Sequence, residues 1–470
     1  MKSRISYFNG TALRKDITRF SPIWGIYSVI LLLYLLMSPT DRDASYARDI
    51  GYLINSMAVV NLIYAGVSAM FLFGDLFNSK LANALHALPM RREGWFLVHT
   101  VAGLLFCIVP NTLAALLSTF WLGQYSYIAF LWLAITVMQY LFFFGVGVLA
   151  AVCAGNRLGM AAVYGIINII SLIVMVLAQY LFMPLLYGIE LNTEPFAFLC
   201  PVVHMVEGEY VLFDYNYQID QVIFLGIDAP LWIYTGVTAA IGLVCLALSV
   251  LVYRRRHIER AGDFLSVKAL APVFLVIFTL GVGVIVYIIA DEVAQLPAYL
   301  FLIIGLFVGF FIGRMFLERR VNVFHPKAFL GFGILTLALG IALAVTWLDP
   351  IGMTRYVPDT DEIESVYLYD GYLGGTDVDY LRHTLQLTDS SDLEAITEIH
   401  DSLIKERRSD YDFKCTLLYK LKDGRMVKRY YPVTVNSRAG QQLHPFFSSW
   451  EYIFRNDVTL SKLTGVLFNR

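Results

Sequence analysis

Residues 127–151 read YIAFLWLAITVMQYLFFFGVGVLAA, an apolar run without one charged side chain. A helix needs roughly 20 such residues to cross the ~30 Å hydrocarbon core of a bilayer. Because backbone groups in lipid must pair within their own segment, a run of this kind is expected to be a helix. The segment therefore predicts a membrane span.

The same pattern recurs on both sides of this run. The whole chain is 58% hydrophobic and 15% charged, whereas a soluble domain carries about 25% charged residues. We therefore expect an all-α polytopic membrane protein of about nine spans. The other eight apolar segments are Ile23–Met37, Leu53–Phe73, Trp95–Phe120, Met160–Tyr187, Leu231–Tyr253, Leu270–Ala290, Pro297–Phe316 and Ala328–Leu348.

Lys and Arg are distributed unevenly among the loops. One set of segments holds 17 of them: 1–21, 74–94, 152–159, 254–269 and 317–327. The opposite set holds two: 38–52, 121–126, 188–230 and 291–296. Because positive charge in short loops marks the cytoplasmic side, this bias predicts a cytoplasmic N-terminus in a cell membrane. With nine spans, the C-terminal residues 349–470 are expected outside the cell.

Residues 1–21 place apolar Phe8, Leu13 and Ile17 among basic side chains. This composition is typical of an amphipathic helix that lies in the membrane interface before the first span. A disordered basic tail is the alternative.

Residues 349–470 predict a small soluble α+β domain. Alternating residues at 364–369 and 383–387 indicate strands, and a capping box at Ser391 opens a helix through about Arg407. Lys422-Asp423-Gly424 predicts a hairpin turn between strands 413–421 and 425–435. A last helix is expected over 446–454. We expect the histidines of this domain, His383, His400 and His444, to be separate surface residues.

The predicted spans contain few groups that could carry out chemistry. Almost no charge lies near their centres, which disfavours a proton-driven carrier, while a sodium-coupled carrier that uses backbone carbonyls stays open. The interior polar residues are expected to hydrogen-bond helix to helix. They are Asn55, Asn61, Asn111, Gln139, Asn168 and Gln179.

Motifs for cofactor and metal chemistry are missing. The sequence has no GxxxxGK[ST] phosphate loop and no HExxH zinc motif, so we expect no cofactor on this chain and ATP hydrolysis, if used, on another polypeptide. Five cysteines lack metal-ligand spacing. A disulfide between Cys200 and Cys415 stays open, because both are expected outside the cell.

The segment 74–94 reads GDLFNSKLANALHALPMRREG and predicts a short amphipathic helix between two spans. Phe77, Leu81, Leu85 and Leu88 fall at helical spacing, and Pro89 ends the helix. Such a helix either rests on the lipid or docks into a groove of a soluble partner.

This layout resembles a known family. An N-terminal interfacial helix, two spans and HALPMRREGWFLVH at 86–99 look like the membrane subunit of an ABC exporter of the ABC-2 type. The basic stretch YRRRHIERAGD at 253–263 resembles the segment after the sixth span in permeases of Gram-positive bacteria. Apolar residues 195–213 resemble the outer re-entrant hairpin of that family.

The resemblance implies an architecture and a function. Residues 22–253 would form a six-span permease core with the outer hairpin in 188–230, and 254–269 a basic loop. Residues 270–348 would add three spans, which depart from the basic core. The function implied is an ATP-driven exporter of an amphipathic or hydrophobic substrate.

The resemblance also implies partners. A cytoplasmic ABC ATP-binding subunit, carrying ATP and Mg, would take Phe77, Leu81, Leu85 and Leu88 into its surface. Arg91 and Arg92 would pair with its acidic groups or with lipid phosphate. A second permease chain, identical or different, and membrane lipids complete the expected partners; nucleic acid is not among them.

Two other functions stay open. One is a membrane-anchored envelope sensor or assembly factor whose outer domain binds a ligand without transport. The other is a lipid-modifying enzyme, for which His99, Asp75 and His204 are the candidate polar residues.

Overall fold

The computed structural model describes residues 8–37, 44–86, 90–122, 126–216, 221–256, 260–294, 297–370, 385–407 and 411–447. Its contacts divide the chain into two units, each of which is described by itself. The first unit comprises residues 1–175 and 193–332, and the second comprises 176–192 and 333–470.

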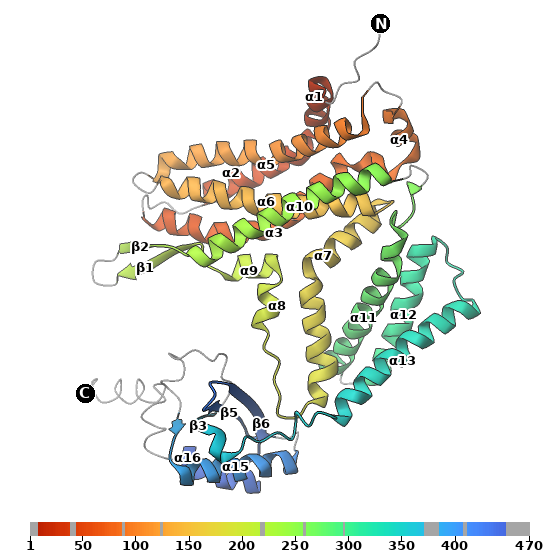
Figure 1. The fold of residues 1–470 in the computed structure, drawn as a ribbon. Coiled ribbons are helices and arrows are strands. Elements are labelled where there is room, and N and C mark those ends of the chain that lie inside the picture. The colour runs from red at the N-terminus through yellow and green to blue at the C-terminus, as the bar shows by residue number, and fades with distance from the viewer. Residues whose placement is uncertain are drawn as a thin grey trace. The chain divides into compact units, whose positions relative to one another are not determined.

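The chain is mainly helical (Figure 1). Its long helices are α2 (Ser21–Met37), α3 (Ala44–Leu72), α5 (Arg92–Leu122), α6 (Tyr127–Cys153), α7 (Arg157–Leu177), α10 (Ala229–Arg255), α11 (Ala271–Ile288), α12 (Ala298–Glu318) and α13 (Pro326–Leu348). Shorter helical pieces connect them. These are α1 (Gly10–Arg19), η1 (Gly74–Phe77), α4 (Ser79–His86), η3 (Ala178–Phe182), η4 (Met183–Leu185), α8 (Glu194–Phe198), α9 (Pro201–Glu207), η6 (Lys268–Leu270) and η7 (Ile289–Val293).

Within the described residues, eight helices are long and apolar enough to cross a membrane. The first predicted span lies in α2, which joins α1 at a 61° bend, and this bent pair supplies a ninth candidate. Pro22 in the first turn of α2 and a hydrogen bond from Trp24 Nε1 to the Ile17 carbonyl (3.0 Å) stabilise the bend. This is the architecture of a multi-pass membrane protein.

Helix α6 forms the centre of the first unit, and α3 and α10 pack along it (Figure 1). The α6–α10 contact is so close that a Cβ on Gly145 would lie 2.2 Å from the Gly242 carbonyl oxygen. Two backbones can approach this closely only where neither residue carries a side chain. Among the eight candidate spans in the described residues, α6 is the most buried.

A hydrogen-bonded network runs through this core, as expected for its interior polar residues. Asn111 Nδ2 donates to Tyr27 Oη (2.9 Å), and Asn61 Nδ2 donates to Gln139 Oε1 (3.1 Å). Gln139 in turn donates to Tyr210 Oη (3.3 Å). For Asn61, Asn111 and Gln139, the prediction of helix-to-helix hydrogen bonding is confirmed, because a polar group in lipid is stable only when it is paired.

Residues Gly10–Arg19 of the N-terminal segment form helix α1, which makes a contact that was not predicted. Asn9 caps its N-terminus by accepting a hydrogen bond from Thr11 N (2.9 Å). Ala12 packs with Trp95 and Val98 of α5. The helix is therefore fixed to the bundle on one side.

The segment 188–230, expected to hold a re-entrant hairpin, contains both helices and strands. Its apolar part forms two short helices, α8 and α9, and then an antiparallel hairpin of β1 (Val211–Asn216) and β2 (Gln221–Ile227). The hairpin was not predicted. Cys200 donates to the Asn168 carbonyl (3.4 Å), and neither Cys200 nor Cys415 forms a disulfide.

The second unit carries a four-stranded antiparallel sheet of order β4-β3-β5-β6. The strands are β3 (Ile363–Asp370), β4 (Leu385–Leu387), β5 (Phe413–Leu421) and β6 (Met426–Val433). A 3-10 turn η8 (Thr360–Glu362) precedes the sheet, and α15 (Ser390–Glu406) and α16 (Arg438–Phe447) complete the unit. The small α+β domain is confirmed. Helix α16 buries Ala439 and Leu443 and was not predicted over 438–445, while residues 448–454 of the helix expected over 446–454 lie outside the described residues.

His400 corrects the expectation of surface histidines. It is fully buried, with Nε2 2.8 Å from Tyr431 Oη and Nδ1 2.9 Å from Tyr419 Oη. His444 is exposed, and His383 lies outside the described residues.

The loop after α7 belongs to the second unit. Gly188 O accepts a hydrogen bond from Tyr430 N (3.1 Å), and Lys428 Nζ lies 3.4 Å from a Glu190 carboxylate oxygen. The segment was predicted to belong with the outer hairpin of the permease core.

Candidate functional site

The connection between α3 and α5 forms a helical turn and a short helix, η1 and α4. Asn78 separates them and caps α4, accepting a hydrogen bond from Lys80 N (3.0 Å). Phe77 packs partly against the core of the bundle, whereas Leu81 is 44% exposed. Leu85 lies on α4, and Leu88 lies outside the described residues.

The two predicted arginines differ in their placement. Arg91 is exposed just before α5 begins. Arg92 turns toward α10 instead: its Nη2 donates to the Arg256 carbonyl (3.2 Å), and its Cζ lies 5.5 Å from the Tyr253 ring centroid. In this structure the Arg92 side chain thus joins α5 to α10.

Arg256 holds η1 against the bundle, a contact that the amino-acid sequence did not predict. Its Nη1 donates to the carbonyls of Ala151 (3.0 Å) and Val152 (2.9 Å), in the last turn of α6. Its Nη2 donates to the carbonyl of Leu76 in η1 (2.7 Å). Carbonyls in the last turn of a helix have no partner in the helix itself, so one guanidinium satisfies two helix-end carbonyls and holds the turn. Burial lowers the pKa of Arg256 to about 10, so the side chain remains charged at neutral pH.

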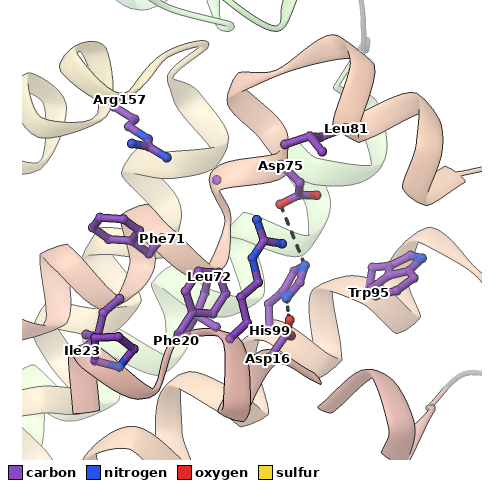
Figure 2. Close-up of a pocket in the computed structure, with 13 residues that line it drawn as sticks. Asp16, Phe20, Ile23, Phe71, Leu72, Asp75, Leu81, Trp95, His99 and Arg157 are labelled. Atoms are coloured by element: carbon purple, nitrogen blue, oxygen red, sulfur yellow. Dashed lines mark hydrogen bonds and ion pairs between the residues drawn. The ribbon is translucent and has the colours of Figure 1, made fainter. Parts of the chain in front are cut away.

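A cavity of about 600 Å³ lies beside η1, which is the size of small-molecule sites in proteins. The ends of α1, α2, α3, α5 and α7 surround it, and the connecting elements η1 and α4 complete its wall (Figure 2). Its apolar lining residues are Phe20, Pro22, Ile23, Phe71, Leu72, Leu81 and Trp95. Its charged or titratable ones are Asp16, Arg19, Asp75, His99 and Arg157.

His99 is the centre of a charged group in the cavity wall. Its Nδ1 lies 2.8 Å from Asp16 Oδ2, and its Nε2 lies 3.8 Å from Asp75 Oδ1 (Figure 2). The three residues come from α5, α1 and η1, so the group joins three elements that are distant in sequence. Asp75 Oδ1, His99 Nε2 and Trp95 Nε1 are buried without a hydrogen-bond partner among the described residues.

Of the three candidates for a lipid-modifying enzyme, the structure brings two together. His99 and Asp75 line the cavity, whereas His204 lies on α9 with its ring 4.3 Å from that of Tyr234. Among the described residues that line the cavity there is no Ser, Thr or Cys, and the described chain has no cluster of three metal-binding side chains. A histidine flanked by two carboxylates is here suited to binding and to holding helices together. Asp16, which sequence reasoning missed, could have been found only by its place on the apolar side of the N-terminal helix.

Comparisons with protein-family models, curated proteins and solved structures give no match for this chain. The resemblance to ABC-2 exporters therefore rests on the layout of the sequence.

Proposed function

We propose that this chain is the membrane subunit of an ATP-driven exporter of the ABC-2 type, with ATP hydrolysis on a separate cytoplasmic polypeptide. The observation that carries the proposal is an exposed apolar residue on a short helix that adjoins a turn bound to the bundle. Leu81 on α4 is exposed, while the adjoining η1 is bound to the bundle through Leu76 and Asp75. A helix that only rested on lipid would not need this attachment.

The contacts of η1 explain how a push on α4 could reach the spans. Arg256 links η1 to α6, and it follows directly after α10. His99 links η1 to α1 and α5. Arg254 Nε lies 3.2 Å from a Glu93 carboxylate oxygen and joins α5 to α10 a second time. Coupling of this kind requires a contiguous physical network, and these contacts supply one between α4 and four helices.

The proposed orientation is a cytoplasmic N-terminus and an outer second unit. The excess of Lys and Arg supports it, and so does the second unit. The sheet of the second unit is formed by the chain that follows α13. The segment that follows α7 contacts this sheet through the Glu190–Lys428 ion pair and the Gly188–Tyr430 hydrogen bond. The two helices would then end on the same side, as alternating spans require with three spans between them: α10, α11 and α12.

The transport path would lie between two such chains. Among the described residues, helix α6 and the Tyr27–Asn111 and Asn61–Gln139 hydrogen bonds occupy the interior of the bundle, which favours a route between copies. The apolar outer faces of the spans favour an amphipathic or hydrophobic substrate that moves along the surface between subunits.

The test is the dependence of partner binding on α4. The tagged chain is purified in mild detergent and the bound polypeptides are identified and assayed for ATP hydrolysis. We expect a stoichiometric chain with a phosphate loop, lost together with the ATPase activity in Leu81→Asp and in Leu85→Asp. Leu225→Asp is the matched control, because Leu225 is a 63% exposed leucine on β2, near the other end of α10.

Three results are decisive. Loss of the partner in the α4 variants alone supports the permease. Retention of the partner at full affinity in Leu81→Asp shows that α4 does not dock it. A preparation that contains no ATPase, under conditions that preserve membrane complexes, favours the sensor or assembly factor instead.

A further inference from the structure

The cavity beside His99 continues into a second hollow. This groove of about 490 Å³ lies between α2 and α3, with Ile26 and Ile30 on one wall and Ile63 and Val67 on the other. Pro22 and Ile23 line both hollows. Together they form one site with a polar end at the helix termini and an apolar part along two membrane helices. That is the shape of an amphiphile with one polar head and a long chain.

The polar end has a cationic wall. The Arg19 guanidinium carbon lies 5.2 Å from the Phe20 ring centroid, and that of Arg157 lies 5.2 Å from the Phe71 centroid. The two rings contact each other edge to face, with centroids 6.4 Å apart. Both arginines are exposed and neither pairs with a described carboxylate. Guanidinium groups held over aromatic rings at the membrane boundary are good partners for a lipid phosphate.

The opposite wall requires a hydrogen-bond donor. Asp75 Oδ1 is buried, has no hydrogen-bond partner among the described residues, and lies 3.8 Å from His99 Nε2. The ion pair with His99 is too long for a hydrogen bond, and a buried carboxylate oxygen without a hydrogen bond is costly, so a ligand that donates a charged hydrogen bond to Asp75 gains most. A primary ammonium can donate such a bond, whereas the quaternary ammonium of a choline has no N–H.

We propose that this site binds an aminophospholipid such as phosphatidylethanolamine. Its phosphate lies against Arg19 and Arg157, its ammonium donates to Asp75, and one acyl chain fills the groove between α2 and α3. A phosphatidylglycerol headgroup would satisfy the arginines but would offer Asp75 only neutral hydroxyl donors in place of an ammonium, and a hydrogen bond between two charged groups is the stronger one. The inference requires only that the helices lie in a bilayer and does not depend on an ATPase partner.

Lipid retention by the full chain tests the headgroup. Delipidated protein is incubated with phosphatidylethanolamine, phosphatidylcholine or phosphatidylglycerol of identical acyl chains, and bound lipid is counted by native mass spectrometry. We expect about tenfold stronger retention of phosphatidylethanolamine, the ratio that one charged hydrogen bond supplies. Asp75→Asn should abolish its advantage over phosphatidylcholine, and Arg157→Gln should weaken phosphatidylethanolamine and phosphatidylglycerol alike. Arg255→Gln, an exposed arginine at the end of α10 outside the site, is the control.

A second pair of variants tests the groove without touching a charge. Ile63→Trp fills the groove, whereas Val59→Trp places the same side chain on an exposed position of α3 outside it. We expect lipid retention to fall in the first and to stay at the wild-type value in the second. This pair decides the question if Asp75→Asn does not fold.

The proposal is wrong if the three lipids are retained equally. It is also wrong if phosphatidylglycerol is preferred and Asp75→Asn leaves that preference unchanged, or if Ile63→Trp and Val59→Trp retain phosphatidylethanolamine alike.

Discussion

Arg256 donates a hydrogen bond of 2.7 Å to the main-chain carbonyl of Leu76, 180 residues earlier in the chain. The same guanidinium holds the last turn of α6 through Ala151 and Val152. A single side chain therefore connects the end of α10, the end of α6 and the turn that carries α4. No local sequence pattern shows such a contact, because its three acceptors are backbone oxygens.

We predict that Arg256→Gln destabilises the bundle by about 1.5–3 kcal/mol, the range for hydrogen bonds to a charged group. Three buried carbonyls would lose their donor. The measurement is the thermal unfolding of the chain in detergent, together with hydrogen exchange of residues 74–86, which should become faster. Arg255→Gln should change stability by no more than about 0.5 kcal/mol, as for an exposed residue. Equal behaviour of the two variants would show that the contact is not structural.

The packing of α6 on α10 gives a second prediction with a matched control. A Cβ on Gly242 would lie 2.5 Å from the Leu141 carbonyl oxygen, whereas a Cβ on Gly236 of the same helix meets nothing within 4 Å. Gly242→Ala should therefore separate the helices and cost about 1–3 kcal/mol, as overpacking does. Gly236→Ala should be neutral or slightly stabilising, because alanine favours a helix. Unfolding midpoints in detergent measure both, and a stable Gly242→Ala would contradict the close contact.

The membrane helices were predictable because the cost of burying charge or unpaired backbone in lipid leaves long apolar runs in the sequence. The run at 127–151 became α6, Tyr127–Cys153. The first span was harder to define, since Pro22 and the Trp24–Ile17 hydrogen bond bend the chain and leave α2 only 17 residues. In the second unit, the turn at Asp423-Gly424 identified β5 and β6 because Gly424 adopts a φ of 86° there.

The candidate site was predictable only in part. The spacing of Phe77, Leu81 and Leu85 predicted one helix, but the structure divides it: Phe77 ends η1, and Leu81 and Leu85 lie on α4. The cavity could not be predicted, because it is formed by residues of α1, η1, α5 and α7 that meet only in three dimensions. Likewise, the pattern of residues 400–431 gives no sign that His400 lies between two tyrosines.

The ion pair between Asp16 and His99 leads to a third prediction. Asp16 Oδ2 lies 2.8 Å from His99 Nδ1 and is the charged contact between α1 and α5. Asp16→Ala should release α1, at a cost of about 1.5–3 kcal/mol for the lost charged hydrogen bond. Hydrogen exchange of residues 10–19 should accelerate, while that of α6 should stay unchanged. Lys15→Ala, its exposed neighbour, is the control; if both variants exchange alike, α1 is held by its apolar contacts alone.

The buried His400 predicts an acid-sensitive second unit. Burial, together with the nearby charge of Arg429, lowers the pKa of His400 to about 3, below the ordinary value of 6.5. In the unfolded chain the imidazole takes up a proton at about pH 6.5, so acid favours unfolding: stability is complete above pH 6.5 and falls as the pH decreases toward 3. Between pH 7.5 and 5.5 the loss from this one group is about 1.4 kcal/mol. Hydrogen exchange of β5 and β6 in the full chain, corrected for the intrinsic effect of pH, should show this loss of protection.

The control is His400→Gln, whose side chain can hydrogen-bond to Tyr419 or Tyr431 but cannot be protonated in this range. Protection of β5 and β6 in this variant should therefore lack the loss of about 1.4 kcal/mol between pH 7.5 and 5.5. If wild type and His400→Gln respond identically to pH, then His400 is not the group that makes the unit acid-sensitive.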